Sequence, residues 1–133
     1  MLKRELRELY TAYIGCLNNR DWAELALYVD QDVCRNGQYL GLDGYRDMLL
    51  NDCRLIPDLQ FDVKMLIVDC PYLFSRIQFD CSPLDGFMGL SFGGVRVSFF
   101  EHVVYQFRNG RIFDVRSILD KSAVESQLLL SKG

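Results

Sequence analysis

Residues 95–120 read VRVSFFEHVVYQFRNGRIFDVRSILD, two segments rich in β-branched and aromatic residues on either side of Asn109-Gly110. Asn-Gly between such segments predicts a two-residue type I′ turn, because both central positions of this turn need a positive φ. The turn sets the register of a β-hairpin in which Arg108 faces Arg111 and, further along, His102 faces Ser117. This hairpin constrains the fold strongly, since its register assigns each side chain to one of two faces.

The expected register divides the hairpin into an apolar face and a charged, mixed face, because side chains alternate along a strand. The apolar face has the chain's only histidine in its middle and consists of Ser98, Phe100, His102, Val104, Gln106, Phe113, Val115, Ser117 and Leu119. The charged face consists of Phe99, Glu101, Val103, Tyr105, Asp114, Arg116, Ile118 and Asp120. An apolar wall with a few polar groups suits a pocket for a lipophilic small molecule. We therefore expect the first face to line such a pocket.

The remaining sequence predicts helices first and antiparallel strands afterwards. Helices are expected over residues 2–18, after Asp21 and over 44–55, and a closing helix or turn over 121–130. Strands are expected near 32–36, 38–40, 59–69 and 72–81, with a glycine-rich loop over 82–94. This order is typical of the α+β class. We expect one domain, residues 1–133, in which a curved, mostly antiparallel sheet with three helices encloses a cone.

Composition and charge exclude several classes of function. The net charge is −3 and no basic cluster is larger than Lys3-Arg4, so a nucleic-acid partner is not expected. The N-terminus is charged throughout and no apolar run approaches the length of a membrane span, which predicts a cytoplasmic protein. The five cysteines form no CxxC motif and there is one histidine, so neither a metal site nor a cofactor is expected.

Several pieces of the sequence, taken in order, carry a family resemblance. They are YTAYIGCLNNRDW, DVCRNGQYLGLDGYRDML, IPDLQFDV, PYLFSRIQFDCSP, FMGL, and EHVVYQFRNGRI followed by SILDK and a late Gln-Leu. Over nearly its whole length the chain resembles the SnoaL-like polyketide cyclases and their fungal relatives, the meroterpenoid isomerases. The fourth and sixth pieces look closer to the fungal isomerases.

The resemblance implies a ketosteroid-isomerase-like (nuclear-transport-factor-like) cone fold. It also implies a cofactor-independent isomerase or cyclase acting on a lipophilic polyketide or meroterpenoid intermediate. A non-catalytic small-molecule-binding or dimeric interaction module on the same scaffold is the alternative, because fold alone does not determine function.

Two positions depart from the family's usual pattern. Arg35 stands where a histidine usually precedes Asn36-Gly37. Ser117 stands where many of the polyketide cyclases have an aspartate that acts as general acid/base, and Arg116 replaces the tryptophan before it. These departures favour a different acid/base residue, or a binding role.

His102 is the first candidate for that residue, since an imidazole can exchange protons near neutral pH and the family tends to have histidine there; the alternative is a histidine with a structural role. Ser117, opposite it, would orient the ring. Asn36 would either donate to a carbonyl oxygen that gains negative charge or satisfy backbone groups at the edge of the strand. Arg35 is adjacent to it, so the two point to opposite faces and at most one of them faces the cone. Asp52 lies near a helix C-terminus, where the macrodipole disfavours an anion, which hints at a functional carboxylate or a solvated acid.

The other expected site residues are one acid and a set of pocket-lining side chains. Asp58 follows Pro57 and either makes a turn contact or, facing an apolar cavity, shuttles protons. The expected substrate-binding residues are Arg35, Asn36, Arg76, Phe100, Val104, Phe113 and Val115.

The charged face of the hairpin has two readings. Glu101, Arg116 and Asp120 are expected to form a structural or dimer-forming salt-bridge cluster; if the two faces are assigned the other way round, they become the catalytic set. A homodimer is expected, because a sheet this long leaves one face needing cover.

Overall fold

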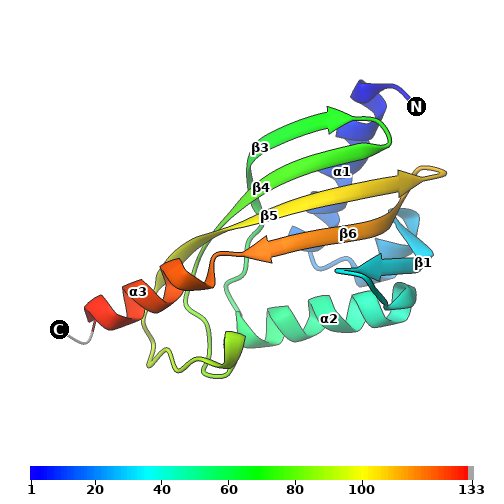
Figure 1. Cartoon of the computed structure of the whole chain (residues 1–133). Helices are drawn as coiled ribbons and strands as arrows, with labels where there is room; N and C mark the ends of the chain where they lie inside the picture. Colours follow the sequence, from blue (N-terminus) through cyan, green and yellow to red (C-terminus); the bar gives the residue numbers. More distant parts are fainter. Residues whose placement is uncertain (132–133) are drawn as a thin grey trace.

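The computed structural model describes residues 1–131, whose elements follow one another as shown in Figure 1. The helices are α1 (Lys3–Asn18), the 3-10 helix η1 (Trp22–Leu27), α2 (Gly41–Leu55), the 3-10 helix η2 (Phe87–Gly89) and α3 (Lys121–Ser131). The strands are β1 (Val29–Arg35), β2 (Gln38–Tyr39), β3 (Asp62–Asp69), β4 (Tyr72–Cys81), β5 (Val97–Arg108) and β6 (Arg111–Leu119). No helix within residues 1–131 is long and apolar enough to cross a membrane.

One curved sheet joins all six strands in the order β2-β1-β6-β5-β4-β3. Every neighbouring pair is antiparallel except β1 and β6, which run parallel. Helices α1 and α2 lie on the inner side of the sheet, and α3 extends from the end of β6 (Figure 1). The expected α+β cone with three main helices is confirmed, with a mixed sheet.

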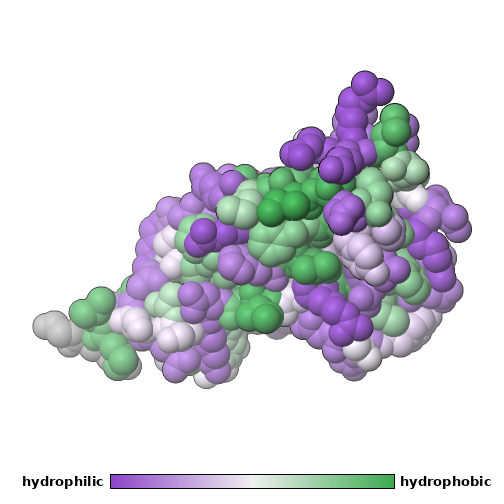
Figure 2. All heavy atoms as spheres, turned by 45° about the horizontal axis from the view of Figure 1, so that its top comes forward, coloured by the Kyte–Doolittle hydropathy of each residue, from purple (hydrophilic) through white to green (hydrophobic). Residues whose placement is uncertain are grey.

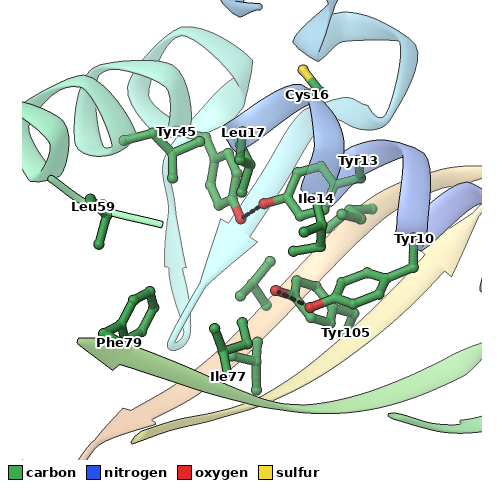
Figure 3. Packing of buried hydrophobic residues seen from close by; sticks show 14 of the residues in the cluster. Tyr10, Tyr13, Ile14, Cys16, Leu17, Tyr45, Leu59, Ile77, Phe79 and Tyr105 are labelled. Atoms are coloured by element: carbon green, nitrogen blue, oxygen red, sulfur yellow. Dashed lines mark hydrogen bonds between the residues drawn. The ribbon is translucent and has the colours of Figure 1, made fainter. Parts of the chain in front are cut away.

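Amphipathic spacing explains why α1 and α2 pack where they do. In α1 the buried residues include Leu6, Tyr10, Tyr13 and Leu17, which recur every three or four positions and so lie on one face. In α2 the buried residues Leu42, Tyr45 and Leu49 recur in the same way. Both apolar faces meet the inner face of the sheet and form one hydrophobic core with it (Figure 3).

The hairpin turn forms as expected, but the register beyond it does not. Asn109 and Gly110 both have positive φ, 52° and 75°, and Arg108 pairs with Arg111. Gln106 then pairs with Asp114, which leaves Phe113 as an extra residue in β6. Such a β-bulge shifts all later pairs by one position.

The shift makes the expected pairing of His102 with Ser117 wrong. His102 pairs with Ile118, and Ser117 pairs with Val103. Paired residues share a face of the sheet, so beyond the bulge each face of β5 is combined with the face of β6 opposite to the one expected.

The face of β5 that we expected to line the pocket is the outer face. Phe99, Val103 and Tyr105 are buried, whereas Val104 is 43% exposed. The inner face of the hairpin therefore combines Phe99, Glu101, Val103 and Tyr105 from β5 with Val115, Ser117 and Leu119 from β6. The expected assignment was inverted for β5 and correct for β6 beyond Phe113.

Candidate active site

A cavity of about 140 Å³ lies between the inner face of the sheet and helices α1 and α2. Its apolar lining comprises Leu17, Met48, Leu49, Ile56, Leu59, Phe61, Phe79, Phe87, Phe99, Val103, Val115 and Leu119. Its polar lining comprises Tyr13, Arg35, Tyr45, Asp52, Glu101, Tyr105 and Ser117. A largely apolar cavity with a few convergent polar groups is the typical form of a small-molecule site.

Asp52 faces the cavity because of its position on α2. It follows Tyr45, Met48 and Leu49 at the spacing of one helix face, where an apolar residue would be expected. Burial raises the pKa of its carboxyl group from 3.8 to about 6, and the nearby Arg35 guanidinium opposes the rise. The anion that the macrodipole disfavours near the C-terminus of α2 is therefore a carboxylate that faces the cavity.

Glu101 occupies the centre of the β5 inner face, between Phe99 and Val103. Burial raises the pKa of its carboxyl group from 4.5 to about 7; Arg35 opposes the rise, and the Asp52 carboxylate adds to it. A carboxyl group with a pKa near 7 exchanges protons readily at neutral pH. Raised carboxyl pKa values in a cleft are typical of functional sites.

Neither carboxyl group is used to hold the fold together. Among residues 1–131, the side chains of Asp52 and Glu101 make no hydrogen bond and no ion pair with another residue. Buried charged groups in proteins normally have such partners, because an unpaired one costs stability. The two carboxyl groups are therefore available to a ligand.

Arg35 supplies the positive charge of the cavity. Its partner in β6 is Val115, which places both side chains on the inner face. The guanidinium Nη2 donates to Ser117 Oγ at 3.1 Å. The same guanidinium lowers the pKa of both Asp52 and Glu101, so it is electrostatically coupled to both.

Asn36 holds the end of β1 against β6 rather than facing the cavity. Its φ of 50° is left-handed, its backbone N–H donates to the Val115 carbonyl at 2.8 Å, and its Oδ1 accepts from the Ser117 N–H at 2.8 Å. The expected contact of Asn36 with a substrate carbonyl is wrong, because Asn36 is not among the residues that line the cavity. What Asn36 does is fix the strand end that presents Arg35.

The expected roles of His102, Phe100, Val104 and Arg76 in the pocket are wrong, because all four project from the outer face of the sheet. His102 is exposed and packs edge-on against Phe74, with ring centroids 5.5 Å apart. The Arg76 guanidinium lies 3.7 Å from the Phe100 ring centroid. Phe100, His102 and Val104 belong to the inverted face of β5, and Arg76 on β4 shares that face because it pairs with His102.

Two further expected site residues lie outside the cavity. Phe113 is the bulged residue, and the Arg108 guanidinium covers its ring at 4.1 Å. Asp58 accepts hydrogen bonds from the Ser82 N–H at 3.0 and 3.1 Å and lies 3.5 Å from Arg96, so it makes the turn contact rather than the proton shuttle.

The expected salt-bridge cluster on the charged face does not form. Arg116 pairs with Asp114 at 3.1 Å, and Asp120 accepts from the Ala123 N–H at the start of α3. The cavity holds four expected site residues, Arg35, Asp52, Val115 and Ser117, and one residue of the alternative set, Glu101.

The three tyrosines of the cavity were not found by sequence reasoning. Periodicity alone places a tyrosine in the core but does not show whether its hydroxyl group faces a cavity. For Glu101 a signal was present, since it alternates with Phe99, Val103 and Tyr105, which are all apolar or aromatic. Within the described residues, no group of three His, Cys, Asp or Glu side chains is arranged to hold a metal ion.

Comparison with known proteins gives one family and a set of similar structures. Residues 7–128 match the family described as SnoaL-like polyketide cyclase. The structure is similar to that of a SnoaL-like polyketide cyclase from Agrobacterium tumefaciens, with 45% identity, a TM-score of 0.91, and coverage of 96% of this chain and 99% of that one. No curated protein matches the sequence.

More distant structures share the fold alone. TsrD from Streptomyces laurentii has 16% identity and a TM-score of 0.85, covering 96% of this chain and 97% of that one. IdmH from Streptomyces antibioticus has 16% identity and a TM-score of 0.80, covering 92% and 97%. The 45% identity with a bacterial cyclase corrects the expectation that the chain stands nearer the fungal isomerases.

Proposed function

This chain belongs to the SnoaL-like polyketide cyclase family, and we propose that it is a cyclase or isomerase that acts without a cofactor. Its substrate is a lipophilic polyketide or meroterpenoid intermediate, and the reaction proceeds by acid–base catalysis in the cavity. The observation that carries this proposal is the pair of carboxyl groups, Asp52 and Glu101, that share an apolar cavity and have no partner in the fold among residues 1–131.

Glu101 is the residue that moves the proton. Its ionised carboxylate takes a proton from a carbon next to a substrate carbonyl, and the electron pair of the C–H bond moves into the enolate. In a cyclisation the enolate carbon then bonds to a second carbonyl carbon, and the protonated Glu101 returns the proton to the resulting alkoxide. No atom is gained or lost, so one residue with a pKa near the working pH is sufficient.

Asp52 and Arg35 set the protonation of Glu101. The Asp52 carboxylate raises the pKa of Glu101, and the Arg35 cation lowers it. Arg35 also provides positive charge in the cavity, where negative charge develops on substrate oxygens.

The position of Glu101 accounts for the missing aspartate at position 117. Glu101 pairs with Leu119, so on the inner face it is the diagonal neighbour of Ser117 across β5 and β6. An acid/base group on β5 thus reaches the same part of the cavity as one on β6. Ser117 instead accepts the hydrogen bond from Arg35.

The size of the cavity limits the reacting part of the substrate. A cavity of about 150 Å³ in another protein binds one benzene ring, and the cavity here is about 140 Å³. We infer that the reacting portion is about one six-membered ring in size.

The test is proton exchange at a carbon next to a carbonyl. 2-Tetralone, a lipophilic enolisable ketone, is incubated with the protein in D₂O, and the loss of its C1 proton signal is followed by NMR. Exchange faster than in buffer, abolished by Glu101→Gln, is the expected result. Saturable binding of the ketone without exchange would instead support the non-catalytic binding module.

The natural substrate can be identified with a strain that lacks the gene. Extracts of a strain lacking the gene are incubated with the purified protein. Conversion of an accumulated intermediate into an isomer of the same mass is the expected result.

We further propose a homodimer formed through the outer face of the sheet. Paired positions place Met65, Ile67, Tyr72, Val104 and Ile118 on that face, and these side chains are 43–77% exposed. Figure 2 shows apolar side chains gathered in a patch bordered by polar ones. Exposed apolar patches are typical of protein interfaces. Sedimentation should give twice the 15.4 kDa chain mass, and Ile67→Asp should give the monomer.

A further inference from the structure

Four buried tyrosines form two hydroxyl pairs beside the cavity (Figure 3). The hydroxyl oxygens of Tyr13 on α1 and Tyr45 on α2 are 2.7 Å apart. The Tyr10 hydroxyl on α1 donates to the Tyr105 hydroxyl on β5 at 3.3 Å. All four side chains are at most 4% exposed, and three of them, Tyr13, Tyr45 and Tyr105, line the cavity.

A count of protons shows that two donors are unused. Each hydroxyl carries one proton, so four protons are present in the two pairs. Each pair uses one of them in its internal hydrogen bond. Within residues 1–131 no acceptor takes the proton of Tyr105 or the second proton of the Tyr13–Tyr45 pair.

Buried donors without an acceptor cost stability, and most buried polar groups avoid this state. Here both unused donors belong to residues that line the same cavity as the two unpartnered carboxyl groups. A ligand that brings an acceptor oxygen into this apolar cavity would satisfy both hydroxyl donors.

We propose that Tyr105 and the Tyr13–Tyr45 pair hold the anionic oxygen of an enolate or phenolate, as two hydroxyl donors in the cavity. This inference rests on the proposed function and deepens it, since it names the feature that the substrate must present. That feature is a ring-sized apolar group carrying a carbonyl oxygen that becomes an enolate oxygen when Glu101 takes the neighbouring proton.

The surroundings suit this role. Burial raises the pKa of Tyr105 and of Tyr13 well above the ordinary value, so both hydroxyls keep their protons at neutral pH. Fixed donors aimed at a developing oxyanion are worth far more in a water-poor cavity than in water. Tyr10 does not line the cavity, and its hydrogen bond to Tyr105 polarises the hydroxyl that does.

The experiment measures binding of 4-nitrophenol, whose ionised form absorbs visibly and imitates an enolate. At pH 6 the Glu101 carboxyl group, with a pKa of about 7, is mostly protonated and repels the anion little. The wild-type protein should bind the ionised form preferentially. Tyr105→Phe should weaken that binding roughly ten- to hundredfold, the usual effect of losing a hydrogen bond to a charged group.

Tyr10→Phe is the matched control, because it breaks the same Tyr10–Tyr105 hydrogen bond but leaves the Tyr105 donor in place. It should weaken binding by a few-fold at most. The double variant Tyr13→Phe/Tyr45→Phe should weaken binding as Tyr105→Phe does, and the single variants identify which hydroxyl carries the free proton. Equal effects of Tyr10→Phe and Tyr105→Phe would overturn the proposal, since they would show a purely structural role.

Two further readouts keep the result interpretable. If a variant fails to fold in thermal melts, NMR of the wild-type complex decides: the proposal requires downfield-shifted hydroxyl protons that appear with 4-nitrophenolate, and their absence contradicts it. The proton-exchange assay separates this inference from the proposed function. Exchange that needs Glu101 but proceeds at full rate in Tyr105→Phe overturns the inference alone, whereas tyrosine-dependent phenolate binding without any exchange overturns the proposed function alone.

Discussion

Replacing Glu101 by glutamine should change how the stability of the protein depends on pH. In the folded chain burial raises the pKa of this carboxyl group from 4.5 to about 7. Between these two values the folded state binds more protons than the unfolded state. The free energy of unfolding therefore falls as the pH rises through this window, and it levels off above about pH 7.

The size of the effect follows from the two pKa values. Each pKa unit corresponds to about 1.4 kcal/mol, so ionising Glu101 in the folded protein costs up to about 3 kcal/mol at pH 8. Part of the side chain is reached by solvent, which screens the charge and makes this an upper bound. Glutamine has nearly the same shape and no charge, so Glu101→Gln removes the cost.

The assay is urea unfolding of both proteins at pH 5 and at pH 8. The difference in free energy of unfolding, variant minus wild type, should be more positive at pH 8 than at pH 5 by about 1–3 kcal/mol. Glu125→Gln, on the exposed side of α3, is the matched control and should show no such change. If Glu101→Gln destabilises the protein equally at both pH values, the carboxyl group is not held in an apolar cavity and the reasoning fails.

Three further predictions use the proton-exchange assay. Asp52→Asn removes a neighbouring negative charge and so lowers the pKa of Glu101. Because exchange needs ionised Glu101, the pH at which the exchange rate rises should be lower in this variant than in the wild type. Arg35→Gln removes the opposing positive charge and should move the same rise to a higher pH, and a shift of either profile in the other direction would contradict the assigned electrostatics. His102→Ala, on the outer face, should leave the exchange rate unchanged within about twofold, as judged from single-turnover rates.

The architecture could be predicted from the sequence because its signals are local. The helical spacing of α1 and α2, the antiparallel strands and the Asn109-Gly110 turn all come from neighbouring residues, and they are where we expected them. Boundaries differ by a few residues: the helix expected over 44–55 begins at Gly41, and the short helix after Asp21 is a 3-10 helix.

The residues that line the cavity could not all be predicted, because the faces of β5 and β6 that lie together depend on the bulged residue Phe113. Nothing in IFDV marks Phe113 as the bulged position, since a regular strand and a bulged strand both accept this sequence. A register shift of one residue moves every side chain to the other face. The alternation of Phe99, Val103 and Tyr105 around Glu101 indicates the inner face of β5 correctly. The side-chain patterns of β5 and β6, combined through the expected register, do not, because the bulge changes that register.

Proton exchange of 2-tetralone by Glu101→Gln and His102→Gln, measured side by side at neutral pH, shows which face of β5 carries the acid/base residue. Both variants remove a titratable group from β5, one from the inner face and one from the outer face. We predict that Glu101→Gln lowers the rate by about a hundred- to ten-thousand-fold, as expected for the loss of general acid–base catalysis, and that His102→Gln keeps the wild-type rate. Loss of exchange in His102→Gln with full exchange in Glu101→Gln would instead place the acid/base residue on the outer face.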